Sequence, residues 1–319
     1  MTHTSGRKRG RVMSRVVTAA IAVALMGTAA GTAVAAPATT APAGTAAKAT
    51  AKAGTAKPKA APRKGIAAPQ GILSGSNPSF SLLAVDDLGL LWDYEPNGRG
   101  NFEDRSLSGS NWDGVSAAIQ VDTDRDGRTD GQYLRGFDGK LLFYPGGDAP
   151  KQAIGPGWNI YDRMLSPGDL GGASPSDILA RDKSGVLWLY LARPDNTLSD
   201  RIRVGGGWDQ YTDIAGRGDL NGDGLNDIVA KDRSGNLWFY KGTGNTNDPF
   251  ESRVKVGGGW DIYNTLVGTG DVDHDGRSDL LARDKSGVLW LYSGNGNQSD
   301  PFNNRTKIGG GWNEFRLMF

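Results

Sequence analysis

Three short acidic segments carry the residue types best suited to chemistry in this chain. Each follows the pattern Asp-x-Asp/Asn-x-Asp-Gly-x-x-Asp, at residues 122–130, 219–227 and 271–279. Carboxylates at positions 1, 3 and 5 of a tight loop can converge on one point, and a carboxylate at position 9 closes the cage. Hard oxygen ligands at this spacing suit Ca²⁺. Because three copies share one register, we favour calcium sites over the alternative of solvated acidic turns.

A longer repeat positions these loops. A Gly-Gly-Gly-Trp type segment recurs, with its Trp residues spaced 46, 50, 52 and 52 residues apart, and a Leu-Trp-x-Tyr segment recurs beside it. All nine Trp fall on these two positions: Trp112, Trp158, Trp208, Trp260 and Trp312 in the first, and Trp92, Trp188, Trp238 and Trp290 in the second. A fixed period in this range with short strands is typical of propeller blades.

Each unit predicts four strands. In the last unit, residues 279–284 form an apolar run, residues 285–287 a tight turn and residues 288–292 a second strand. Residues 305–308 predict a third strand, and Trp312 opens a fourth that ends at the C-terminus. Four short strands that are apolar on both faces fit a blade held between two neighbours.

We therefore predict an all-β fold, a β-propeller of about five four-stranded blades. The C-terminal strand, residues 314–319, would complete the sheet that the first unit starts. Ile72-Leu73 looks like a further copy of that strand type, so an array that does not close is the alternative. We favour closure, because an open array would expose a β-edge.

The first 70 residues differ from the rest in composition. Residues 1–35 combine a basic start, an apolar stretch and an Ala-Val-Ala cleavage signal, which indicates a secretory signal peptide rather than a membrane anchor. Residues 36–70 are rich in Ala, Pro, Thr and Lys and predict a disordered linker. Residues 71–319 hold the repeats. We expect a secreted, extracellular protein with no stable membrane insertion after signal cleavage.

Charge is distributed unevenly along the chain. Residues 1–70 hold 11 basic and no acidic side chains, whereas residues 71–319 hold 25 basic and 35 acidic ones, a net charge of −10. Bound Ca²⁺ would offset much of this deficit. The basic linker either contacts an anionic cell wall or serves as a solubilising spacer. The acidic repeat region has no basic stripe, so we expect no nucleic-acid partner. The chain has no Cys, which excludes disulfides and thiolate metal sites.

Residues 71–319 resemble the FG-GAP/VCBS-type repeats of secreted bacterial proteins, which are related to the blades of the integrin α-subunit propeller. The acidic loops, the apolar strands after them and the Leu-Trp-x-Tyr strands carry the resemblance. It implies a β-propeller with Ca²⁺ in loops at one rim, acting in adhesion or ligand binding. It also implies that the loop side chains are metal ligands: Asp122, Asp124, Asp126, Asp130, Asp219, Asn221, Asp223, Asp227, Asp271, Asp273, Asp275 and Asp279. A loop at residues 169–177 keeps the acids at positions 1 and 9 but lacks those at 3 and 5.

We expect a protein that is not an enzyme. The His of the repeat region, His274, lies inside a calcium loop, and the chain has no Gly-x-Ser-x-Gly elbow. Its four Glu residues fall at non-equivalent repeat positions and in no recognisable motif. The alternative is a secreted propeller glycoside hydrolase with paired carboxylates in a central pocket.

Binding is the class of function that the repeats favour. Trp158, Trp208, Trp260 and Trp312 lie beside Gly-rich segments. In one interpretation these indoles are exposed ligand platforms, which would suit the apolar face of a sugar; in the other they fill the gaps between blades. The Trp of the Leu-Trp-x-Tyr strands is expected in the core. The ligand is a glycan or an extracellular protein; the second possibility includes a scaffold for a secreted protease or its substrate.

Overall fold

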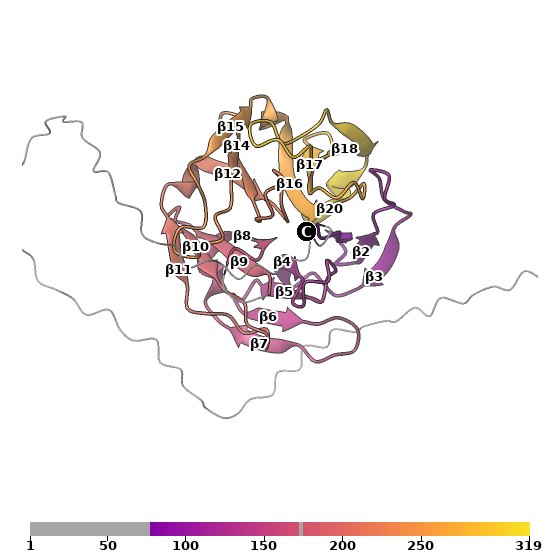
Figure 1. The fold of residues 1–319 in the computed structure, drawn as a ribbon. Helices are drawn as coiled ribbons and strands as arrows, with labels where there is room; N and C mark the ends of the chain where they lie inside the picture. The colour runs from indigo at the N-terminus through magenta and orange to yellow at the C-terminus, as the bar shows by residue number, and fades with distance from the viewer. Residues whose placement is uncertain (1–76, 172–174) are drawn as a thin grey trace, which may run out of the picture. The chain divides into compact units, whose positions relative to one another are not determined.

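The computed structural model describes residues 77–171 and 175–319, and these form twenty short strands in five four-stranded antiparallel sheets (Figure 1). This confirms the predicted all-β propeller of about five four-stranded blades. The predicted signal peptide, the predicted linker and Ile72-Leu73 lie outside the described residues. Within the described part of the chain, no helix has the length and hydropathy that would let it cross a membrane.

The sheets succeed one another along the chain, and each is named here as a blade. Blade 1 contains β1 (Leu82–Asp86), β2 (Leu91–Tyr94), β3 (Ser106–Gly109) and β20 (Phe315–Met318). Blade 2 contains β4 (Val115–Val121), β5 (Gly131–Gly136), β6 (Leu141–Tyr144) and β7 (Gln152–Gly155). Blade 3 contains β8 (Tyr161–Gly168), β9 (Asp177–Asp182), β10 (Leu187–Tyr190) and β11 (Ile202–Gly205). Blade 4 contains β12 (Tyr211–Ala215), β13 (Ile228–Asp232), β14 (Leu237–Tyr240) and β15 (Val254–Gly257). Blade 5 contains β16 (Tyr263–Gly270), β17 (Asp279–Asp284), β18 (Leu289–Tyr292) and β19 (Thr306–Gly309).

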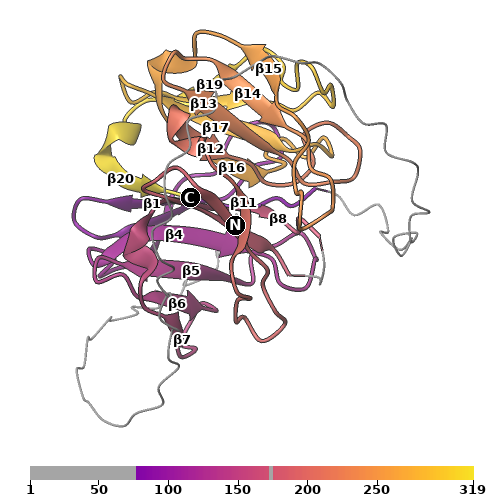
Figure 2. The same ribbon diagram turned by 90° about the vertical axis from the view of Figure 1, so that its left-hand side faces the viewer.

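Blade 1 takes its innermost strand from the far end of the chain. β20 pairs antiparallel with β1, with Ala84 opposite Met318 (Figure 2). Just beyond this pair, Leu83 and Phe319 exchange backbone N–H···O bonds of 3.0 and 2.9 Å. The first and last strands therefore share one sheet, as predicted, and the ring closes. The inner strands β4, β8, β12, β16 and β20 surround the centre.

The apolar core is divided among the junctions between blades. Five clusters of buried side chains occur in the described residues, and each combines two neighbouring blades. At one junction, Leu187 and Leu189 of blade 3 pack with Ile228 and Ala230 of blade 4. Strands that are apolar on both faces thus bury both faces. A blade has little core of its own, so its stability depends on its neighbours.

An Asp side chain builds the hairpin turn between the second and third strands of a blade. In blade 5, Asp284 Oδ1 accepts the backbone N–H of Val288 at 3.0 Å, and Gly287 takes the predicted positive φ, +83°. Asp284 Oδ2 accepts the indole N–H of Trp290 at 2.9 Å. The guanidinium of Arg305 lies 4.1 Å from the centre of this partly exposed indole.

The other three Leu-Trp-x-Tyr indoles share this arrangement, with an Asp acceptor and a stacked Arg. The prediction that these Trp belong to the core is confirmed in part: each ring packs against a buried cluster between blades but stays partly exposed. The indole N–H must reach the hairpin Asp, which holds one edge of each ring near the surface.

The Gly-rich segment before Trp turns the chain from the outermost strand of one blade to the innermost strand of the next. Gly311, directly before Trp312, has a φ of +93°, a conformation that a side chain disfavours. Trp312 then begins a 3₁₀ turn, and the fourth strand starts only at Phe315. The predicted strand start at Trp312 is thus wrong, because the left-handed Gly reverses the backbone there. Similar turns begin at Trp158, Trp208 and Trp260.

A cation on each blade ties that blade to this turn in the next one. Arg181 of β9 is buried and donates from Nη1 to the backbone oxygens of Trp208 and Tyr211, at 3.0 and 2.5 Å. In blade 1 the cation comes from β20, because β1 has Val85 at the equivalent position. We call these five residues the clamp cations: Arg135, Arg181, Lys231, Arg283 and Arg316.

Replacement of Arg181 by Met tests the clamp. The apolar stem would remain, but two carbonyl oxygens would lose a charged donor in a buried setting. We expect the free energy of unfolding to fall by about 2–4 kcal/mol, measured by urea denaturation. The control is Lys183→Met at an exposed position, which should change it by less than about 0.5 kcal/mol. A loss for Arg181→Met no larger than that of the control would contradict the clamp.

Candidate functional site

The three acidic loops lie at one rim of the ring. Each connects the innermost strand of its blade to the second strand, from β4 to β5, from β12 to β13 and from β16 to β17. The segment before β1 crosses this rim. Its Ser79 donates a backbone hydrogen bond of 3.0 Å to Gly127 of the first loop. Its Pro78 accepts one of 2.8 Å from Asp271 of the last loop.

The loop at residues 271–279 gathers three of its predicted ligands. Asp271, Asp273 and Asp275 each offer a carboxylate oxygen, and these oxygens lie within 4.8 Å of one another. The loop holds them in place, since Asp271 Oδ2 accepts the N–H of Gly276 at 2.8 Å and Ser293 Oγ donates to Asp273 at 2.7 Å. Burial raises the pKa of Asp271, and the two neighbouring carboxylates raise it further. This donor set fits a cation that prefers oxygen ligands.

The loop at residues 122–130 gathers a different set. Here the converging carboxylates belong to Asp122, Asp124 and Asp130, again within 4.8 Å of one another. Asp130 Oδ2 accepts both the backbone N–H and the hydroxyl of Thr123, at 2.6 and 2.7 Å. Burial raises the pKa of Asp122. Asp126 is not part of this set, so three of the four predicted ligands come together, and they also fit an oxygen-seeking cation.

The loop at residues 219–227 does not gather three carboxylates in the described structure. The ammonium of Lys241 lies 3.1 Å from Asp223 and meets part of its charge. The amide Nδ2 of Asn221 donates to Asp227 at 3.1 Å. Asp219 accepts the backbone N–H of Gly224 at 2.6 Å. This loop therefore fits a cation less well than the other two, although its sequence follows the same pattern.

The carboxylate at position 9 has a role that sequence reasoning missed. Asp279 is buried, and its two oxygens accept backbone N–H groups from Val272 and Gly294, both at 2.8 Å. Asp227 and Asp177 make the same pair of bonds in their blades. These three residues form what we call the backbone clasp. Asp177 belongs to the loop without acids at positions 3 and 5, and this isolated acid was the signal for a structural role.

The four Trp considered as ligand platforms are buried. Trp158, Trp208, Trp260 and Trp312 are 6–7% exposed. Each ring centre lies 4.5–4.7 Å from that of the Tyr on the Leu-Trp-x-Tyr strand that packs beside it. No flat indole face is free for a sugar, so the geometry favours the alternative interpretation that these side chains fill the gaps between blades.

A groove of about 370 Å³ lies next to one of these Trp, at the junction of blades 4 and 5. Tyr292 contributes aromatic surface, and the exposed side chains of Asp300, Asn303 and Asn304 contribute hydrogen-bonding groups. The full lining consists of Val256, Gly257, Trp260, Tyr292, Asp300, Phe302, Asn303, Asn304 and Arg305. The accessible lining is mainly polar, and convergent polar groups beside an aromatic ring suit a polar ligand.

A family model described as an FG-GAP-like repeat matches residues 219–282, a span that includes two of the acidic loops and the strands between them. This match and the five four-stranded blades together fit an FG-GAP/VCBS-type repeat propeller. A search of curated proteins found no match.

Solved structures resemble the chain more distantly. Of these, 156 chains match, and one belongs to the crystal structure of human WBSCR16. That alignment covers 71% of this chain and 65% of the other, at 10% identity and a TM-score of 0.33. The chain thus spans slightly less than two thirds of that protein's length, and at this TM-score the likeness carries no argument.

The backbone clasp predicts a pH dependence. Burial raises the pKa of Asp177 to about 8, and this outweighs the two backbone N–H donors, which lower it. The folded chain therefore holds an extra proton between about pH 4 and pH 8, and the free energy of unfolding falls as pH rises through that window. We expect Asp177→Asn to flatten this slope, measured as melting temperature against pH in the presence of a chelator.

The control for this series is Asp148→Asn, which changes an exposed carboxyl group outside the clasp. It should keep the slope of the unmodified protein. Equal slopes for the unmodified protein and Asp177→Asn would show that Asp177 does not titrate in this range.

Proposed function

We propose that this chain is a secreted, non-catalytic binding module that Ca²⁺ stabilises and that recognises a glycan or an extracellular protein. The observation that carries the proposal is the convergence of three carboxylates in each of two loops at one rim of an FG-GAP/VCBS-type propeller. The propeller with its FG-GAP repeat suggests a binding or scaffold module. The signal sequence at residues 1–35 supports secretion, where calcium is available.

Electrostatics support Ca²⁺ as the bound ion. Asp122 and Asp271, in the loops at residues 122–130 and 271–279, are buried and lie beside further carboxylates. Burial and the neighbouring negative charges both make ionisation of these two groups less favourable. A divalent cation would reverse that cost by favouring the ionised forms. Ca²⁺ accepts the irregular geometry of such loops more readily than Mg²⁺, which demands a near-ideal octahedron. A bound ion would hold together carboxylates from different positions of one loop. It would thereby stabilise the loops against which residues 77–80 pack.

The acidic side chains at the central cavity of the ring support a non-catalytic role. A propeller glycosidase needs two carboxyl groups that face one pocket. Asp162 is the acidic side chain among the described residues that line the central cavity. Arg181 donates two hydrogen bonds to it, at 2.8 and 3.1 Å. Asp213 next to this cavity is paired with Arg163 at 2.5 Å. Both carboxylates are thus engaged in structural ion pairs with arginines.

Calcium should raise the melting temperature of the protein. Extracellular modules bind Ca²⁺ with a Kd of about 10⁻⁴–10⁻³ M, and at 100 times Kd each site contributes about 2.7 kcal/mol. Asp273→Asn and Asp124→Asn should each remove roughly one site, measured by titration calorimetry and by thermal unfolding with Ca²⁺ or chelator. Asp169→Asn, in the loop that lacks acids at positions 3 and 5, is the control.

Magnesium at the same concentration should have a smaller effect. If the chelated, demonstrably metal-free protein melts at the same temperature as the protein with calcium, the calcium proposal is wrong. If Asp169→Asn weakens calcium binding as much as Asp273→Asn does, the assignment of the sites to these loops is wrong.

The groove beside Trp260 is the proposed site for a glycan. The ring of Tyr292 supports the apolar face of a sugar, and the carboxylate and amides of Asp300, Asn303 and Asn304 suit its hydroxyl groups. The residues at the edge are exposed, so they contribute little to the core. This separates the proposed binding residues from the buried Trp260, whose removal would create a cavity between blades.

Asn303→Ala together with Asn304→Ala should abolish glycan binding on an array and leave the melting temperature unchanged. Gln298→Ala, an exposed amide outside the groove, is the control and should bind normally. Trp260→Ala should instead cost about 3–5 kcal/mol of stability. Unchanged glycan binding in the double variant would exclude the groove. No glycan binding by the unmodified protein, with capture of a secreted protein, would favour the protein-ligand alternative.

A further inference from the structure

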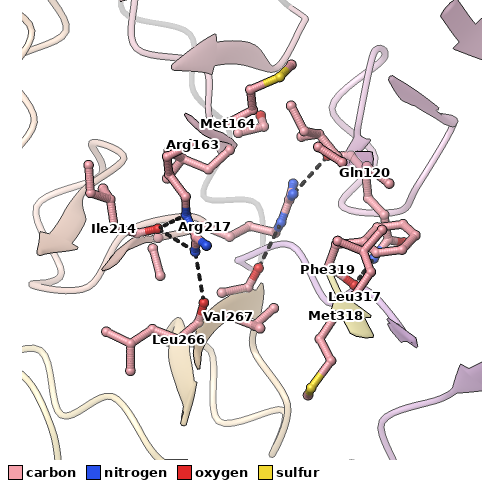
Figure 3. A pocket seen from close by; sticks show the side chains of 18 of the residues that line it. Gln120, Arg163, Met164, Ile214, Arg217, Leu266, Val267, Leu317, Met318 and Phe319 are labelled. Atoms are coloured by element: carbon pink, nitrogen blue, oxygen red, sulfur yellow. Dashed lines mark hydrogen bonds between the residues drawn. The ribbon is translucent and has the colours of Figure 1, made fainter. Parts of the chain in front are cut away.

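The centre of the ring encloses a cavity of about 160 Å³, lined by the inner strands of the blades (Figure 3). Its lining is mixed: Met164, Ile214 and Val267 contribute apolar surface beside polar and charged groups. Three arginines line it, Arg135 on β5, Arg163 on β8 and Arg217 just after β12. Arg135 is a clamp cation whose Nη1 donates to the backbone oxygen of Tyr161. The partners of the other two arginines differ.

Arg163 is neutralised where it lies. Its Nη2 is 2.5 Å from the carboxylate of Asp213, and it also donates to the backbone oxygen of Ile214 at 2.9 Å. Asp213 is buried, whereas the Arg163 side chain is partly exposed. Arg163 therefore needs no further anion.

Arg217 differs from Arg163 in having no carboxylate partner within ion-pair distance among the described residues. It is only 5% exposed. Its Nη2 donates to the backbone oxygen of Gln120 at 2.8 Å, and its Nε makes a long bond of 3.4 Å to Gly268 (Figure 3). Phe80 covers it, with the ring centre 4.1 Å from the guanidinium carbon. Nη1 makes no hydrogen bond to the described part of the chain.

The charge on Arg217 persists at neutral pH. An arginine guanidinium carries its positive charge at pH 7. Asp122 is close enough to interact with this charge but makes no direct ion pair with it among the described residues. A buried charge without a directly paired counter-charge is costly, so protein interiors supply a partner group or a bound ion. Ser166 lines the same cavity, and its buried hydroxyl has no hydrogen-bond partner among the described residues. It offers a second donor group.

We propose that the central cavity binds one small monovalent anion, such as chloride, against the free edge of the Arg217 guanidinium. The donors that such an anion would meet are the free Nη1 of Arg217 and the unpartnered hydroxyl of Ser166. Because Asp122 already offsets part of the charge on Arg217, a monovalent anion fits better than a divalent one. The volume suits a small ion with a few waters rather than a sugar or nucleotide. The anion would thus join the inner strands of several blades at the axis of the ring.

The most direct test is anomalous diffraction from crystals of the secreted chain grown in sodium bromide. We expect a bromide peak within hydrogen-bond distance of Arg217 Nη1. A cavity without such a peak would overturn the proposal, and this result does not depend on whether any variant folds.

A solution experiment tests the same site through stability. With calcium removed, sodium chloride should raise the melting temperature by about 2–4 °C relative to sodium gluconate at equal ionic strength. Arg217→Met should lose this chloride-specific shift, whereas Arg201→Met, which changes a guanidinium stacked on Trp188, should keep it. A shift of equal size in Arg217→Met would overturn the proposal. If Arg217→Met does not fold, Arg217→Lys, which keeps the charge, replaces it and should retain a chloride response.

Discussion

Hydrogen bonds from the clamp cations to the next blade are the interaction on which the rest of this structure depends. The blades share their apolar cores in pairs, so what matters is how one blade is held to the next. Each 3₁₀ turn leaves carbonyl oxygens that accept hydrogen bonds from a clamp cation of the preceding blade, and Arg181 and Lys231 among these cations are buried. A buried carbonyl without a donor is costly, and a buried cation without an acceptor more so. The two groups therefore specify the angle between blades, and β20 extends this pairing to the last junction.

The functional features follow from that arrangement. The left-handed Gly before each 3₁₀ turn directs Trp into the gap between blades, which forms the junction where the groove beside Trp260 lies. The same succession of blades brings the acidic loops to one rim, where residues 77–80 contact all three of them. In blades 3, 4 and 5 the backbone clasp connects the start of the loop to the residue just beyond the Leu-Trp-x-Tyr strand, as Asp279 does between Val272 and Gly294. The proposed metal sites, the groove beside Trp260 and the central cavity thus all depend on how neighbouring blades are joined.

The sequence predicted the features that repeat with a fixed spacing. Blade number followed from the period of the Trp residues, closure from the cost of an open β-edge, and the position of the acidic loops at one rim from the family resemblance. The clamp was missed because Arg181 at the end of an apolar strand resembles a surface residue, and its acceptors, about thirty residues further on, are backbone atoms that carry no sequence signal. A cation at the same position in several units was the available sign.

The two classes of Trp show how local composition misled. Gly beside Trp260 suggested an open loop, but that Gly serves to reverse the chain and bury the ring. Trp290 in an apolar strand suggested the core, but the hairpin Asp284 holds its N–H at the surface. In the acidic loops, spacing alone did not separate residues 219–227 from the other two, since the difference comes in part from Lys241, just after β14.

Amide hydrogen exchange across the closing sheet tests most directly whether the ring behaves as one unit. The exchange rate of an amide gives the free energy of the opening that exposes it. This free energy ranges from nearly zero at fraying ends to the full free energy of unfolding. If the blades depend on one another, the amides of Leu83 and Phe319, which join β1 to the C-terminus, should exchange with the same free energy as Val229 in the middle of blade 4. Exchange of Leu83 and Phe319 at a free energy several kcal/mol lower would show that the ring opens at this sheet while the other blades stay folded, which would contradict the account.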